Sequence, residues 1–108
     1  MKLLFAIVQD EDAKRLTKVL VENDIRVTRV SSSGGFLKSG NSTLMIGVEK
    51  DRLQDALDII KAQSHRRQSL TAAPPIATQT TDSVPIPIEV TVGGATVFQV
   101  DVEECFKF

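Results

Sequence analysis

Residues 2–9, KLLFAIVQ, run directly into residues 10–22, DEDAKRLTKVLVE, and this junction decides the fold class. The first stretch is apolar without alternation, which is typical of a β-strand buried on both faces. The second carries apolar residues at helical spacing behind three acids, which suit the positive end of a helix dipole. We predict a strand followed at once by a helix that Asp10 caps and that Asn23 and Asp24 end. The three acids could instead hold a metal, but successive helix residues point in different directions, which favours the cap.

Two further strands are expected before the middle of the chain. Residues 25–32, IRVTRVSS, are β-branched and alternate, which predicts a half-exposed strand with Arg26 and Thr28 on one face. Residues 42–49, STLMIGVE, form another nearly continuous apolar strand, interrupted by Gly47. A glycine inside a strand often marks a close approach by backbone or ligand.

The second half of the chain contains a second helix and a glycine-centred pattern. Asp51 is expected to cap this helix, with Gln54 as its capping-box partner. Residues 64–84 show no periodicity and contain two adjacent prolines, which predicts a long flexible loop. Residues 88–102, IEVTVGGATVFQVDV, place two glycines between alternating apolar runs, which is typical of a β-hairpin with a two-residue turn.

The order β-α-β-β-α-β with an added C-terminal hairpin predicts an α+β fold, a ferredoxin-like sandwich. We expect a single domain over residues 1–108 with one antiparallel sheet and both helices on one face. In that topology the first and third strands are central, and these two runs are the most uniformly apolar in the sequence.

Composition excludes several classes of protein. The 108 residues are 42% hydrophobic and 25% charged, which is ordinary for a globular domain. The longest apolar run, residues 3–8, is far shorter than the roughly 20 residues of a membrane helix. Cys105 and His65 are the only residues of their types, so no intrachain disulfide and no Cys/His metal site is expected. A Cys–His nucleophile is formally possible, but a buried or half-buried thiol near the C-terminus and a solvated histidine at the end of a helix are favoured. We expect a cytoplasmic protein.

Charge is unevenly distributed along the chain. Residues 1–67 carry twelve Lys and Arg and nine Asp and Glu, whereas residues 68–106 carry five acids and no Lys or Arg. A nucleic-acid-binding protein usually has a net basic domain, and the net charge here is −1. The asymmetry fits a basic surface that meets an anionic small molecule or the acidic region of a neighbouring subunit, and a chance distribution fits equally well.

The loop at residues 35–42, GFLKSGNS, nearly matches a phosphate-binding P-loop. Asn41 replaces the required lysine, and the segment leads into a strand instead of a helix, which excludes nucleotide hydrolysis. A glycine-rich loop that holds phosphate by its N–H groups and a plain connecting turn both remain open. Phe36, an aromatic residue in a polar loop, favours the binding loop, and Arg26 and Lys38 are within reach of an anion. Residue chemistry alone therefore predicts a small anionic ligand with a planar ring, bound at an edge of the sheet or at an interface, and nothing more specific.

Three segments resemble a known family: AIVQD at residues 6–10, GGFLKSGN at 34–41 and GGATVF at 93–98. They are similar to the PII-like cyclic-di-AMP receptor proteins of Gram-positive bacteria. The resemblance covers nearly the whole chain, and residues 64–84 are its divergent part. All six glycines fall within these segments or at Gly47, which also matches.

The resemblance implies a non-enzymatic signalling protein, a homotrimer with one cyclic-di-AMP site at each subunit interface. It implies that the ligand orders the loops and thereby signals to an unknown downstream protein, without a cofactor, metal, nucleic acid or membrane insertion. The positions that match ligand contacts are Asp24, Arg26, Val27, Thr28, Gly35, Phe36, Leu37, Asn41, Gly47 and Phe98.

Asp24 departs from the family pattern, since members commonly carry Asn there, and a carboxylate lacks donor hydrogens and repels phosphate. The last residues, CFKF, also depart, because a Gln precedes the final Phe in close relatives. A trimer that binds another nucleotide or anion, a small nucleotide enzyme and a purely structural oligomeric module are therefore kept as alternatives.

Overall fold

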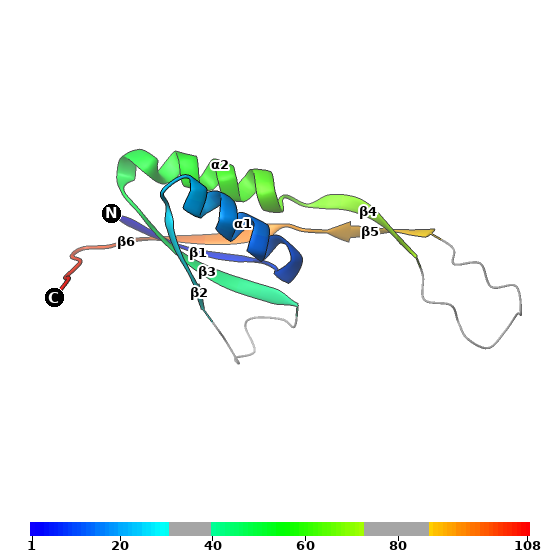
Figure 1. The fold of residues 1–108 in the computed structure, drawn as a ribbon, viewed down its shortest axis with the longest axis horizontal. Coiled ribbons are helices and arrows are strands. Elements are labelled where there is room, and N and C mark those ends of the chain that lie inside the picture. Colours follow the sequence, from blue (N-terminus) through cyan, green and yellow to red (C-terminus); the bar gives the residue numbers. More distant parts are fainter. Residues whose placement is uncertain (31–39, 73–86) are drawn as a thin grey trace, which may run out of the picture.

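The computed structural model describes residues 1–30, 40–72 and 87–108 (Figure 1). Along the chain the elements are β1 (Lys2–Gln9), α1 (Asp10–Glu22), β2 (Arg26–Val30), β3 (Asn41–Val48), a 3₁₀ turn (Lys50–Arg52), α2 (Leu53–Ser64), β4 (Arg67–Ala72), β5 (Pro87–Val92) and β6 (Ala95–Asp101).

Four strands form an antiparallel sheet in the order β2-β3-β1-β6, with α1 and α2 on one of its faces (Figure 1). The strand positions confirm the predicted α+β, ferredoxin-like arrangement, with β1 and β3 in the centre. Alternate residues of these two strands are fully buried beneath the helices, as the two-residue period of a strand requires. The residues that make this core are Leu4, Ala6, Val8, Leu44, Ile46 and Val48 from the strands, and Ala13, Leu16, Leu20, Ala56 and Ile60 from the helices.

The other face of the sheet is not covered by any described element. Its residues on β1, namely Leu3, Phe5 and Ile7, are only half-buried. The prediction that the first strand is buried on both faces is therefore wrong for one copy of the chain. We call this surface the open face of the sheet.

Both predicted helix caps are wrong. Asp10 is the first helical residue of α1, and its carboxylate accepts a hydrogen bond from the Ser42 hydroxyl instead of capping a helix N–H. Asp51 lies in the 3₁₀ turn before α2, whose start has no side-chain cap, and the Gln54 amide donates to Asp58 (2.8 Å). Neither α1 nor α2, the α-helices in the described ranges, has the length and apolarity needed to span a membrane.

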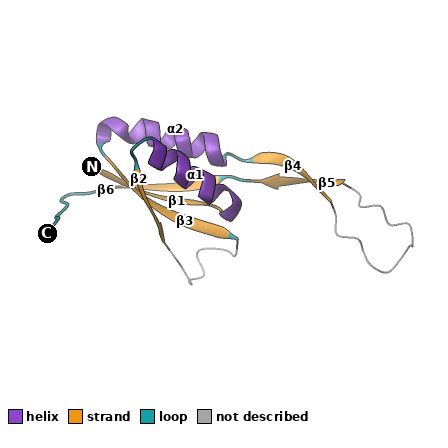
Figure 2. Ribbon diagram, viewed as in Figure 1, coloured by secondary structure: helices purple, strands orange, loops and turns teal. Residues whose placement is uncertain are grey.

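The C-terminal hairpin is also corrected. β5 pairs with β4, and β6 pairs with β1, so Gly93 and Gly94 join two separate sheets instead of turning a hairpin (Figure 2). The predicted loop over residues 64–84 contains the end of α2 and all of β4, and residues 73–84 lie outside the described part of the chain. β4 and β5 form a two-stranded ribbon that extends away from the larger sheet (Figure 1). A polar, weakly patterned strand such as RQSLTA gives little sequence indication because it covers no core.

Candidate functional site

Arg26, Thr28 and Gly47 lie on the open face of the sheet. Arg26 is paired with Gly47 across β2 and β3, and Thr28 is paired with Met45, so their side chains share the face opposite the helices. Val27 points the other way and packs against the core. β2 is an edge strand of the sheet, so Val27 leaves only its main chain for a ligand at that edge.

A hollow of about 300 Å³ opens where β2 begins and β3 ends, and we call it the β2 hollow. Arg26 and Lys107 line it, and neither makes an ion pair with any residue in the described ranges. A Cβ atom at Gly47 would meet nothing within 4 Å, so this subunit has room for a side chain there. The glycine therefore keeps the hollow open beside the Arg26 guanidinium. Its lining is Met1, Asp24, Ile25, Arg26, Gly47, Val48, Glu49, Arg52 and Lys107.

Asp24 lines the same hollow and has a structural role as well. It follows the last turn of α1 with φ of 59°, its N–H donates to the Val21 carbonyl (3.0 Å), and the Ile25 N–H donates to the Leu20 carbonyl (2.9 Å). This pair of hydrogen bonds is a Schellman motif, which ends a helix with one residue in the left-handed region. Asn23 and Asp24 therefore end α1 as predicted, and the sharp turn delivers Arg26 to the open face.

A second hollow, of about 650 Å³, lies at the opposite end of the sheet, and we call it the glycine hollow. Of the predicted ligand contacts that the structure describes, Asn41 alone lines it. Its basic residues are Lys61, His65 and Arg66, and no acidic residue of the described chain lines it. Its apolar floor and polar rim suit an amphipathic anion. The full lining is Ile7, Gln9, Asn41, Leu57, Ile60, Lys61, His65, Arg66, Gly93, Gly94, Ala95, Thr96 and Val97.

One subunit does not bring the predicted ligand residues together. Asn41 and Gly47 lie six residues apart on β3, which at the usual rise separates them by about 20 Å. Phe98 lies on the open face opposite Phe5, with β1 between it and β3, about 10 Å away. Gly35, Phe36 and Leu37, the predicted loop contacts, lie outside the described residues.

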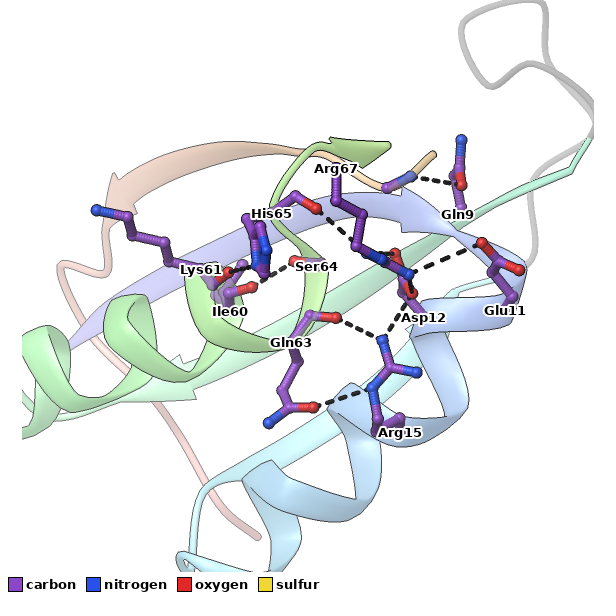
Figure 3. Close-up of polar contacts among 11 residues, drawn as sticks. Gln9, Glu11, Asp12, Arg15, Ile60, Lys61, Gln63, Ser64, His65 and Arg67 are labelled. Carbon is purple, nitrogen blue, oxygen red and sulfur yellow. Dashed lines mark hydrogen bonds and ion pairs between the residues drawn. The ribbon is translucent and has the colours of Figure 1, made fainter. Parts of the chain in front are cut away.

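A buried ion pair lies beside the glycine hollow (Figure 3). The Asp12 carboxylate is completely buried and accepts hydrogen bonds from Arg67 Nη2 (2.7 Å) and Nη1 (3.2 Å) and from Arg15 Nη2 (2.8 Å). The hydrogen bond from Arg67 lowers the pKa of Asp12 below its ordinary value of 3.8, against the opposing effect of burial. Sequence analysis assigns Asp12 to the acidic first turn and misses this partner, since β4 itself was not predicted.

Cys105 and His65 share no hydrogen bond in the described part of the chain. Cys105 is exposed, contrary to the expected buried or half-buried thiol. His65 is exposed at the end of α2 as predicted, and its Nδ1 lies 3.2 Å from the Lys61 carbonyl.

Comparisons with known proteins agree with this fold. A family model described as "Cyclic-di-AMP receptor" matches residues 1–108. A crystal structure of a functionally unknown protein from Pediococcus pentosaceus is 42% identical, with a TM-score of 0.79 over 99% of this chain and 96% of that one.

Proposed function

Since the chain belongs to the cyclic-di-AMP receptor family, we propose that it binds cyclic-di-AMP between the subunits of a homotrimer and signals to a partner protein. The separation of the two hollows in one subunit supports a site that lies between subunits. Arg26 and Gly47 line the β2 hollow, while Asn41 lines the glycine hollow about 20 Å along the same strand. A ring of subunits unites the β2 hollow of one copy with the glycine hollow of the next.

The open face supports assembly through the sheet. Phe98 and Val100 are about half-exposed there, beside the half-buried Leu3, Phe5 and Ile7. Contiguous exposed apolar side chains of this kind mark protein–protein interfaces. Packing these faces together would bury β1 on both sides, which is what its unbroken apolar sequence predicts.

The residues then have distinct roles in the site. Arg26 forms a charge-assisted hydrogen bond to a ligand phosphate, and Thr28 and Asn41 supply neutral hydrogen bonds. Phe98 packs on an adenine face. Gly35, Phe36 and Leu37 enter the proposal through the family resemblance alone. Lys61 and Arg66, on the rim of the glycine hollow, add positive charge for the second phosphate.

We further propose a non-enzymatic, cytoplasmic sensor. Its family is a family of receptors, and its single cysteine suits a reducing compartment. As the family resemblance implies, binding would change loop conformation and thereby the surface offered to the partner.

Calorimetry tests the ligand. Cyclic-di-AMP should release or absorb heat at tens of micromolar protein, whereas ATP and cyclic-di-GMP should not. Arg26→Ala should weaken binding by about 1.5–3 kcal/mol, the contribution of a hydrogen bond to a charged group. Arg29→Ala is the matched control, because Arg29 lies on the same strand but faces the helices and contacts Ser42 (2.7 Å). Equal affinity of the two variants would remove Arg26 from the site, and no heat with cyclic-di-AMP would refute the ligand.

Sedimentation velocity tests the assembly. A homotrimer is expected in the absence of nucleotide, and cyclic-di-AMP should change its sedimentation coefficient. A trimer that responds to no nucleotide would favour a purely structural module, and a monomer would refute the interface.

A further inference from the structure

The β4–β5 ribbon is attached to the body of the protein at a compact joint. One connection follows α2 through His65 to Arg67, and the other passes from β5 through Gly93 and Gly94 into β6. The ribbon strands pair only with each other in the described part of the chain. The direction of the ribbon therefore depends on contacts at this joint.

Asp12 and Arg67 make a buried ion pair at this joint. Arg67 is the first residue of β4, and its guanidinium is held by two hydrogen bonds to the completely buried Asp12 carboxylate at the start of α1 (Figure 3). The fork geometry restricts the orientation of both groups. Arg15 joins the same carboxylate and also donates to the Gln63 carbonyl (2.8 Å), which ties α1 to the end of α2.

The second connection fits around the same arginine. A Cβ atom on Gly93 would lie 2.5 Å from Arg67 Nη1 and 2.5 Å from the His65 carbonyl oxygen. The Gly93 N–H donates to Gln9 Oε1 (2.8 Å), and the Gly94 N–H donates to the Ser64 carbonyl (2.5 Å). Gln9, His65, Gly93 and Gly94 all line the glycine hollow. The joint and the wall of the hollow therefore share these four residues.

A buried ion pair is a weak source of stability, because desolvation opposes the attraction, but it strongly restricts geometry. We propose that Asp12 and Arg67 are positioning residues, whose ion pair fixes the direction of the β4–β5 ribbon. Through Gly93 the same ion pair fixes the shape of the glycine hollow. Ligand binding and the direction of the ribbon are therefore coupled. The coupling to ligand rests on the function proposed above. The fixed direction of the ribbon does not.

Residual dipolar couplings of backbone amides test the direction without any ligand. In the wild-type protein, the amides of β4 and β5 should fit the alignment tensor defined by β1 and β3. In Asp12→Asn they should no longer fit that tensor, because the ribbon takes other directions relative to the sheet. Glu11→Gln is the matched control, since it removes a charge near the same arginine (3.8 Å) from an exposed side chain. A ribbon that still fits the body's tensor in Asp12→Asn would overturn the proposal.

Asp12→Asn removes the buried charge partner of Arg67, leaves only the exposed Glu11 carboxylate near it (3.8 Å), and could fail to fold. The variant Asp12→Asn with Arg67→Gln removes both charges and keeps a hydrogen-bonding pair at the joint. It lacks the two-pronged contact of a guanidinium with a carboxylate, so its ribbon should also depart from the body's tensor. A single common tensor for this double variant would also overturn the proposal.

Titration with cyclic-di-AMP tests the coupling. Asp12→Asn, or the double variant, should bind about fivefold or more weakly than wild type, a usual size for coupling between sites, while Glu11→Gln should match wild type. Unchanged affinity together with a reoriented ribbon would overturn the coupling. If wild type itself binds no cyclic-di-AMP, the proposed function fails and the coupling with it, while the dipolar couplings still decide whether the pair directs the ribbon.

Discussion

Replacing Gly93 with alanine should destabilise the protein more than the same change one residue later. Both glycines have positive φ, 80° at Gly93 and 96° at Gly94, so alanine at either site incurs about 1–2 kcal/mol of left-handed strain. Only at Gly93 would the new Cβ also meet atoms at 2.5 Å, one of them the backbone carbonyl of His65, whereas at Gly94 it would meet nothing within 4 Å. Overpacking of this kind adds about 1–3 kcal/mol. We expect a total loss of about 2–5 kcal/mol for Gly93→Ala and about 1–2 kcal/mol for Gly94→Ala.

Urea unfolding followed by far-ultraviolet circular dichroism measures both losses. The chain contains neither Trp nor Tyr, so intrinsic fluorescence is a poor probe. All variants must be compared at one chain concentration, because the stability of an oligomer depends on it. Losses that agree to within about 0.5 kcal/mol, the usual effect of a neutral surface change, would contradict the close packing described for Gly93.

Three other perturbations test the site and the fold. The pKa of Asp12 is lowered, so its ion pair stabilises the protein above the ordinary pKa of 3.8, and this contribution is lost as the pH falls through the lower pKa of the folded state. The free energy of unfolding of wild type should therefore fall more steeply below pH 3.8 than that of Asp12→Asn. Parallel pH profiles of the two proteins would contradict this. Asp24→Asn should leave the urea midpoint unchanged, because asparagine tolerates the φ of 59°. It should also tighten cyclic-di-AMP binding, because it removes a carboxylate from the β2 hollow. Weaker binding in calorimetry would show that the carboxylate favours binding of the ligand. Phe5→Asp places a charge in the middle of the open face and should yield monomers in sedimentation experiments. Val21 is exposed on α1, so Val21→Asp is the control and should leave the trimer intact. A trimeric Phe5→Asp would exclude this face as the interface.

Patterns that reflect burial predicted the fold well. The unbroken apolar runs of β1 and β3 indicated central strands because both faces of such strands are covered, one by helices and the other, in our proposal, by a second subunit. The stripe that includes Leu16 and Leu20 predicted α1 for the same reason. These residues are buried in the core, and core residues recur in the sequence with the period of the helix or strand that carries them.

An element outside the core can lack this hydrophobic periodicity, and the sequence then does not predict it. β4 is polar and covers no core, and it was taken for a loop, so the true partner of β5 was hidden and Gly93 and Gly94 were assigned to a hairpin. Both glycines have positive φ, as a two-residue turn requires, but the strands that flank them do not pair with each other. Asp12 was missed for a related reason, since its partner Arg67 is 55 residues away and no local spacing relates them.

The candidate site divides in the same way. Alternation along β2 placed Arg26 and Thr28 on one face, and their register opposite Gly47 and Met45 confirms it. The basic rim of the glycine hollow, with Lys61 and Arg66, was not foreseen, because it forms only where the end of α2 meets β6.

The placement of Asn41 and Gly47 on one strand constrains how the two hollows can be spaced. Both residues occupy odd-numbered positions of β3, and the even-numbered positions between them lie on the core face. Deleting or inserting one residue would turn every side chain beyond it to the opposite face, exchanging core for open face. The distance along β3 between the β2 hollow and the glycine hollow can therefore change only by pairs of residues, in steps of about 7 Å. In the proposed ring these two hollows belong to neighbouring sites, so the strand sets the spacing between sites, whereas the contact between subunits sets the length of each site.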